Sequence, residues 1–342
     1  MKNSSFLVLT LVLFSFFNLS VFGSINRGRR FSRKRSSNST NGGTCETILV
    51  RREWRTLSYD EQADYIRAVK CLERRPSRLL GPPYRRCDDF QYVHCNSRSK
   101  VHLNEIFLSW HAYFLVIYEK VLRDECGYLG ALPYWNWSLD ADNITQSPLL
   151  SSDPLVGFGS NGSVMRPDPN DLGAGIVSDG AFAWMRVMYP THALLQRNFR
   201  LDPAFLRPGY YLGSQYYNAA RLNTILSQKT FIWFLMTLEG NYMLSRDQVI
   251  VGPHSVLHTL LGGVLIITFF QFSVFYPHHC HVERIYQLWK SQDPERRTYE
   301  YSDLHGNPAD LDRSLDYMGL VPSIRVRDAM DALKPPMCYR YE

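Results

Sequence analysis

The sequence predicts a mainly α-helical domain with long loops, preceded by a leader and a short basic segment. Apolar residues recur at three- and four-residue steps over 50–72, 103–123 and 282–289, a spacing that places them on one face of a helix. Residues 136–220 are instead rich in Pro, Gly, Ser and Asn, which is typical of connecting loops. With 342 residues, 45% of them hydrophobic, the chain is long enough to bury a sizeable core.

The N-terminus predicts a secretory leader over residues 1–23. Lys2 precedes an almost entirely apolar stretch, 6–22, which ends beside the small residue Gly23. A stretch of ~17 apolar residues is also at the lower limit for a membrane anchor, which is the alternative. We expect a secreted protein without a stable anchor. Four Asn-x-Ser/Thr sequons beyond the leader agree with secretion, at Asn38, Asn136, Asn143 and Asn161.

Residues 24–44 have the Ser-, Asn-, Arg- and Gly-rich composition of a disordered segment. Much of the net charge of +6 lies there rather than on a folded face, so we expect no nucleic-acid partner. The dibasic pairs Arg29-Arg30 and Lys34-Arg35 are either sites for a processing protease or part of a plain linker. The folded domain is therefore expected over residues 45–342.

Within that domain the apolar pattern predicts the elements in order. A first helix is expected from Val50 to Leu72, and a second from Leu103 to Arg123 with Gly127 as its stop signal. Three further apolar stretches follow the loop-rich region. We expect a short helix or strand from Phe231 to Glu239, a buried element from Val264 to Pro277 that is too short to span a membrane, and a helix from Val282 to Trp289.

The chain has seven cysteines: Cys45, Cys71, Cys87, Cys95, Cys126, Cys280 and Cys338. In an oxidising compartment most of them should pair, and the odd number leaves at least one thiol unpaired. The sequence does not fix which cysteines pair. There is no CxxC motif, so a zinc knuckle is not expected.

Seven of the ten histidines fall in two clusters, His94, His102 and His111, and then His254, His258, His278 and His279. The four-residue step from His254 to His258 places both rings on one helix face. Neutral imidazole is a good ligand for copper, zinc and nickel. Zinc proteases use the same step with a Glu after the first His, but Ser255 stands there, which argues against a zinc hydrolase. Six histidines at these spacings indicate metal binding, although any one alone would more often be a core residue.

The motifs resemble those of the tyrosinase, catechol oxidase and hemocyanin family of dicopper proteins. The residues that carry this resemblance are His94, His102 and Phe107-Leu108-Ser109-Trp110-His111, then Gly252-Pro253-His254-x-x-x-His258, then Phe275-Tyr276-Pro277-His278-His279. Flanking segments extend the similarity over residues 45–342. The small secreted fungal tyrosinase-like enzymes are the most similar group.

The resemblance implies a four-helix bundle around two copper ions. The implied ligands are His94, His102 and His111 for copper A, and His254, His258 and His279 for copper B. His278 would be a neighbour, since the family uses the second His of the pair. Each ligand ring should have its other nitrogen engaged by a carbonyl or carboxylate. We expect His281, just beyond the pair, to face solvent on its helix; the alternative is a hydrogen-bond donor behind one of the ligands.

Residues beside the implied ligands depart from the family pattern. Ala112 replaces an Arg, and Ser255 replaces the Asn or similar residue that follows the first copper B ligand. In the family that Asn and a Glu can hold a water that deprotonates monophenols, and Glu239 is our candidate for this catalytic Glu. We therefore expect diphenol oxidation to exceed monophenol hydroxylation. Cys95 is a thioether partner, a disulfide partner or a small buried residue.

The resemblance implies an enzyme that oxidises phenols or o-diphenols to o-quinones with O2. Its substrate would be a small phenolic compound, as in secondary metabolism, or a tyrosine-containing peptide. The alternatives are an O2-binding protein without turnover and a catalytically impaired tyrosinase-like protein. The short chain without repeated domains argues against the first, and the presence of all six histidines argues against the second.

Overall fold

The computed structural model describes residues 43–165, 175–197, 199, 213–240, 250–261 and 272–342. The chain divides into two units, residues 1–41 and residues 42–342, and the described residues belong to the second. The predicted leader, residues 24–42 of the basic segment and most of the expected element over 264–277 lie outside the described residues. Among the described residues, no helix combines the length and apolar character needed to cross a membrane.

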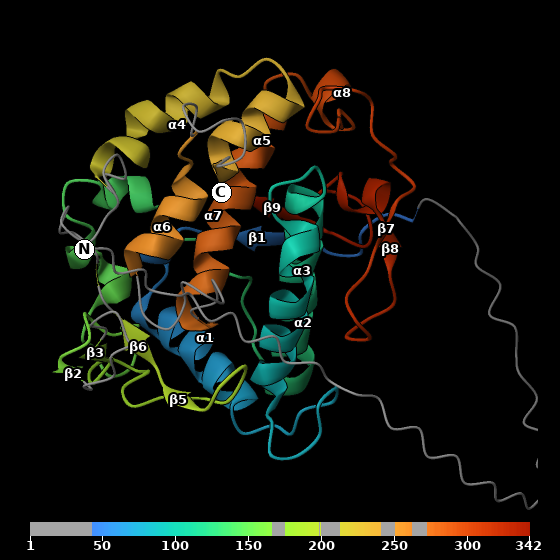
Figure 1. Ribbon diagram of the computed structural model, residues 1–342. Coiled ribbons are helices and arrows are strands. Elements are labelled where there is room, and N and C mark those ends of the chain that lie inside the picture. The colour runs from blue at the N-terminus through green and yellow to red at the C-terminus, as the bar shows by residue number, and fades with distance from the viewer. Residues whose placement is uncertain (1–42, 166–174, 198, 200–212, 241–249, 262–271) are drawn as a thin grey trace, which may run out of the picture. The chain divides into compact units, whose positions relative to one another are not determined.

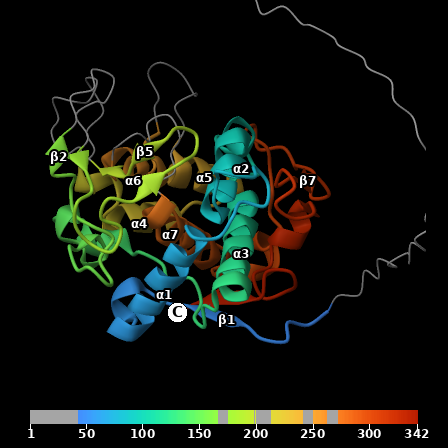
Figure 2. The same ribbon diagram turned by 90° about the horizontal axis from the view of Figure 1, so that it is seen from below.

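Helices dominate the described chain, which confirms the predicted fold class. The α-helices are α1 (Tyr59–Leu72), α2 (Arg86–Val101), α3 (Phe107–Cys126), α4 (Ala219–Leu226), α5 (Phe231–Glu239), α6 (Pro253–Leu261), α7 (Phe272–Ser291) and α8 (Pro294–Arg297). α3 packs against α1, α2 and α7, and α7 packs in turn against α6, as Figures 1 and 2 show. The four helices α2, α3, α6 and α7 carry most of the clustered histidines.

Short elements connect the helices. The 3-10 helices are η1 (Trp54–Thr56), η2 (Trp137–Asp140), η3 (Ile144–Gln146), η4 (Pro148–Leu150), η6 (Ser214–Tyr216) and η8 (Val326–Ala329). The strands are β1 (Leu49–Arg51), β2 (Val164–Met165), β3 (Gly175–Ile176), β4 (Arg186–Val187), β5 (Ala193–Leu194), β6 (Gln196–Arg197), β7 (Ser314–Leu315), β8 (Ile324–Arg325) and β9 (Tyr339–Tyr341). β1 pairs with β9 in parallel, with Leu49 opposite Tyr339, so the two ends of the domain meet.

The first helix begins later than the apolar spacing predicts. The helix expected from Val50 starts at Tyr59, and β1 and η1 occupy the stretch before it. Ser58 sets this start through a capping box, in which its hydroxyl accepts the Glu61 N–H and the Glu61 carboxylate accepts the Ser58 N–H. The predicted stop of the next helix is confirmed, because Gly127 follows α3 with a φ of 63°.

A buried ion pair ties the N-terminal strand to the helix that carries His111. The guanidinium of Arg51 is fully buried and donates to Glu119 on α3 at 2.8 Å. The same carboxylate accepts the Leu132 N–H at 2.6 Å, so its oxygens are well satisfied. Because both charges are removed from water, loss of either partner would leave the other buried and uncompensated.

Four of the seven cysteines form two disulfides, Cys45–Cys338 and Cys71–Cys126. The first joins the segments beside β1 and β9, and the second joins α1 to the end of α3. Cys87, Cys95 and Cys280 are not in disulfides. The prediction that most cysteines pair and at least one thiol does not is confirmed.

Candidate metal centre

The first histidine cluster joins two helices and the turn between them. His94 lies on α2, His111 lies on α3, and His102 is the residue that caps the C-terminal end of α2. One nitrogen from each of the three rings lies within 4.8 Å of the others. The Nε2 atoms of His94 and His102 are 3.2 Å apart. The structure thus brings together all three residues that the sequence predicted for copper A.

Two of these rings are oriented through the nitrogen that faces away from the cluster. His102 Nδ1 lies 3.1 Å from Oε1 of Glu239, and His111 Nδ1 lies 2.8 Å from the carbonyl oxygen of Phe107. A carboxylate or carbonyl acceptor at Nδ1 holds the proton there and leaves Nε2 with its lone pair for a metal. His102 and His111 therefore have the arrangement expected of imidazole ligands.

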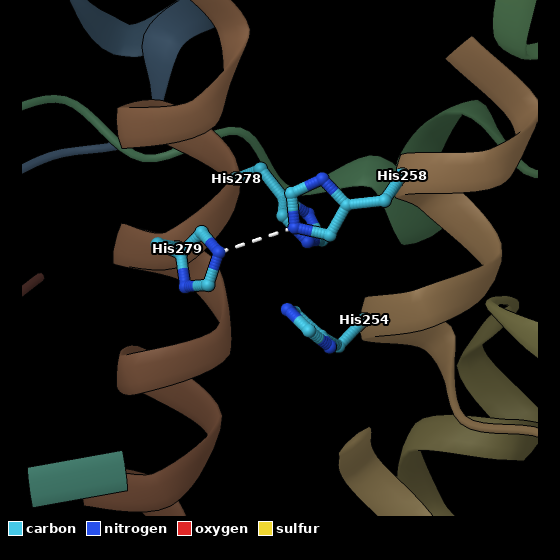
Figure 3. Close-up of side chains that lie close together, drawn as sticks. All are labelled: His254, His258, His278 and His279. Carbon is cyan, nitrogen blue, oxygen red and sulfur yellow. Dashed lines mark hydrogen bonds between the residues drawn. The ribbon is translucent and has the colours of Figure 1, made fainter. Parts of the chain in front are cut away.

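The second cluster faces the first from α6 and α7. His254 and His258 lie one turn apart on α6, and His278 and His279 are consecutive on α7 (Figure 3). These four rings also offer nitrogens within 4.8 Å of one another. The Nε2 atoms of His258 and His279 point toward each other at 3.1 Å. The four-residue step on α6 has the same-face effect that the sequence predicted.

His279, rather than its neighbour His278, faces the first cluster. Its ring stacks on that of His111, with centroids 4.6 Å apart and planes 10° from parallel. His254 likewise stacks against His102 at 5.5 Å. The two clusters are therefore adjacent parts of one centre. His278 packs against His254 and His258 on the α6 side, at ring distances of 5.5 and 4.6 Å.

The protonation state of the histidine rings suits the binding of copper. Burial first, and neighbouring charges second, lower the pKa of His94, His254, His258 and His279 well below the usual value, and lower that of His102 to about 3. The rings are therefore neutral at physiological pH, which is the form that binds copper. Two ligand nitrogens each about 2.0–2.1 Å from one ion are separated by about 3.3 Å, close to the separations of the two Nε2 pairs.

The centre also contains ring nitrogens that find no hydrogen-bond partner within the described part of the chain. His111 Nε2, His279 Nδ1 and both ring nitrogens of His254 are buried without a hydrogen-bond partner among the described residues. Polar atoms in such positions are costly unless something else satisfies them. A bound metal ion would satisfy the nitrogens that face the centre. A carbonyl or carboxylate was expected to engage the second ring nitrogen of each ligand. Among the described residues, such an acceptor is present for His102 and His111 but not for His254 and His279.

Glu239 is the acidic side chain at the centre. It is the last residue of α5 and is 2% exposed, and burial raises the pKa of its carboxyl well above the usual value. Its Oε1 contacts His102 Nδ1 and also accepts the Leu103 N–H at 2.9 Å. The Ser255 hydroxyl donates to the Glu239 backbone carbonyl at 2.6 Å rather than to the carboxylate. The structure therefore brings Glu239, the predicted candidate, to the centre.

One prediction about the surroundings was wrong and one residue was missed. His281 is fully buried rather than solvent-facing, because its ring stacks on Tyr134 at 5.6 Å and meets the edge of Trp137 at 4.6 Å. Phe275 was given no role, yet its ring lies 4.1 Å from His279 and 4.9 Å from His94. Its place one turn before His279 on a helix was the signal that could have found it.

Comparison with known proteins places this centre in a family. Residues 84–292 match the family model described as the common central domain of tyrosinase. The chain is 32% identical over 316 residues to the tyrosinase-like protein phomQ2 of Diaporthe leptostromiformis, covering 89% of this chain and 75% of that protein. It is also 32% identical over 308 residues to the tyrosinase ustQ of Aspergillus flavus, covering 87% and 80%.

The fold has a similar counterpart among solved structures. A polyphenol oxidase from Thermothelomyces thermophila superposes with a TM-score of 0.70 and 28% sequence identity. The superposition covers 86% of this chain and 89% of that one. The part of the chain that matches the family model, residues 84–292, contains every histidine of both clusters.

Proposed function

The chain belongs to the tyrosinase family and is an oxidase of the type 3 copper class, and on this premise we propose that it oxidises o-diphenols to o-quinones with O2. Members of this family act on phenolic compounds with O2. The observation that carries the proposal is the pair of adjacent histidine groups, three residues in one and four in the other, each with nitrogens within 4.8 Å of one another. One group alone would support only a generic metal site.

We propose that six histidines hold two copper ions, namely His94, His102 and His111 for copper A, and His254, His258 and His279 for copper B. The ions, when bound, would supply the two electrons that reduce O2 and the redox capacity that oxidises the phenol. The protein contributes neutral donors, buried surroundings and ring orientations fixed by hydrogen bonds at His102 and His111. His279 is preferred over His278 because its ring stacks on that of His111.

Glu239 remains our candidate for an acidic group that assists the reaction, but its surroundings favour diphenols as substrates. A monophenol must lose its proton to a base before it can be hydroxylated. Oε1 of Glu239 already accepts from His102 and Leu103, and the Ser255 hydroxyl is directed to the backbone carbonyl. One carboxylate oxygen of Glu239 and the hydroxyl proton of Ser255 are thus already engaged, which weakens their hold on a water between the two side chains. We therefore infer that catechols react faster than matching phenols.

We propose that the protein is secreted and that its substrate is a small phenolic compound or a tyrosine-containing peptide. Two disulfides are consistent with an oxidising compartment. The sequons at Asn143 and Asn161 are exposed, as glycan attachment requires, whereas Asn136 is half-buried. Both features agree with a secreted protein. Intact mass before and after glycosidase treatment of the secreted protein would test this part of the proposal.

The ligand assignment is tested by two neighbouring variants, H279Q and H278Q. H279Q should bind about one copper per chain because copper B loses a ligand, whereas H278Q, the matched control, should still bind two. A full copper complement in H279Q together with loss in H278Q would reverse the assignment. Initial rates on a catechol and on the phenol that lacks one hydroxyl test the reaction. A faster phenol reaction would contradict the proposed preference, and two bound coppers without turnover would favour an O2-binding or impaired protein.

A further inference from the structure

We propose that Glu239 is a positioning residue that holds ligands of both copper ions, its carboxylate orienting His102 and its backbone carbonyl anchoring the first turn of α6. This inference rests on the proposed dicopper function and deepens it. It gives Glu239 a role that acts through the ligands and is distinct from the proton transfer for which Glu239 is the candidate above.

The carboxylate fixes the one proposed ligand that lies outside the body of a helix. His102 has extended backbone angles at the end of α2, with φ −120° and ψ 152°. Leu103 follows in the left-handed region with a φ of 55°, which a residue with a branched side chain adopts only at a cost. Oε1 of Glu239 accepts the Leu103 N–H and contacts His102 Nδ1. One oxygen atom therefore holds both the ring and the backbone turn that aims it.

The backbone carbonyl makes the second link. The Ser255 hydroxyl donates to it at 2.6 Å, and Ser255 directly follows His254 in the first turn of α6. The next residue, Gly240, has a φ of 94°, and a Cβ built there would lie 2.8 Å from the nitrogen of Gly252. The end of α5 thus passes very close to the segment that begins α6. This close approach sets the position of His254 relative to His102.

The contacts predict which replacements the centre tolerates. Glutamine keeps an oxygen that can accept from His102 Nδ1 and Leu103 N, so E239Q should preserve the arrangement. Alanine removes that acceptor and leaves both donors buried, so E239A should not. If Glu239 acted as a base, E239Q would lose activity as E239A does, because an amide cannot take a proton. E239Q therefore separates the two roles.

The first experiment measures copper affinity by competition with a chelator for wild type, E239Q, E239A and S255A. E239A should weaken binding of one ion about 10–100-fold, the usual effect of losing an outer partner of a histidine ligand. S255A should weaken binding of the other ion by less, because it loses only one hydrogen bond. E239Q should match wild type in both copper affinities. Wild-type affinities in E239A, or equal losses in E239Q and E239A, would overturn the proposal.

A second measurement decides the matter without copper. Histidine ¹⁵N spectra of the metal-free protein report which ring nitrogen of His102 carries the proton, with H102Q identifying its signals. The Nδ1–H form is expected in wild type and E239Q, and a mixture of forms in E239A. An unchanged His102 signal in E239A would refute the positioning role. Failure of wild type to bind copper would instead refute the proposed function, since the ¹⁵N result stands independently.

Discussion

Replacing Phe275 by alanine tests whether packing between the two histidine clusters stabilises the centre. Phe275 is 1% exposed, and its ring lies 4.1 Å from that of His279 and 4.9 Å from that of His94. Removing the ring leaves a cavity that helical neighbours cannot readily close, and Phe→Ala changes in cores cost about 3–5 kcal/mol. F275L keeps most of the volume and should cost less than about 1.5 kcal/mol.

The assay is equilibrium unfolding of the metal-free protein in urea, followed by circular dichroism with the disulfides intact. The free energy of unfolding of F275A should fall by about 3–5 kcal/mol, while F275L stays near wild type. Copper stoichiometry of F275A should remain two, because none of the six proposed ligands changes. A loss below about 1 kcal/mol in F275A would show that the ring does not fill the space between the clusters, and would refute the packing argument.

Three further predictions concern stability. R51A should lose about 3–5 kcal/mol in urea unfolding because it leaves Glu119 buried without its cation, and a loss under 1 kcal/mol would contradict the buried-pair argument. The metal-free protein should be fully stable above about pH 6.5, the usual pKa of histidine, and should lose stability as the pH falls towards about 3. Burial lowers the folded-state pKa of rings such as His102, so the unfolded chain binds more protons over this range. A melting temperature that does not change with pH over this range would contradict the prediction. The double variant C71S/C126S opens a loop of 55 residues and should lose up to about 4 kcal/mol, whereas an unchanged midpoint of unfolding would show that the disulfide adds nothing.

Local sequence spacing was sufficient to predict the parts of the centre that lie on one element. His254 and His258 share a helix face because they are four residues apart, and His111 lies within the helix that its apolar neighbours predicted. The start of α1 was misjudged because Trp54 and other apolar residues before it continue the helical spacing by chance. The capping box of Ser58 with Glu61 outweighs that spacing.

Contacts between distant segments could not be predicted from spacing. Glu239 meets His102 across 137 residues of sequence, so only the folded structure shows that its oxygen faces that ring. His281 was expected in solvent, but Tyr134 and Trp137, which are far from it in the sequence, enclose its ring. The pairing of the cysteines depends on the same long-range arrangement.

The copper content of the purified protein, measured together with its absorption spectrum after addition of hydrogen peroxide, tests the central claim most directly. Two coppers per chain and a strong new band in the near ultraviolet are predicted, because two adjacent three-histidine sites bring the ions close enough to act on one O2 unit. Fewer than one copper per chain, or two coppers without the band, would contradict a coupled dicopper centre built from these six histidines.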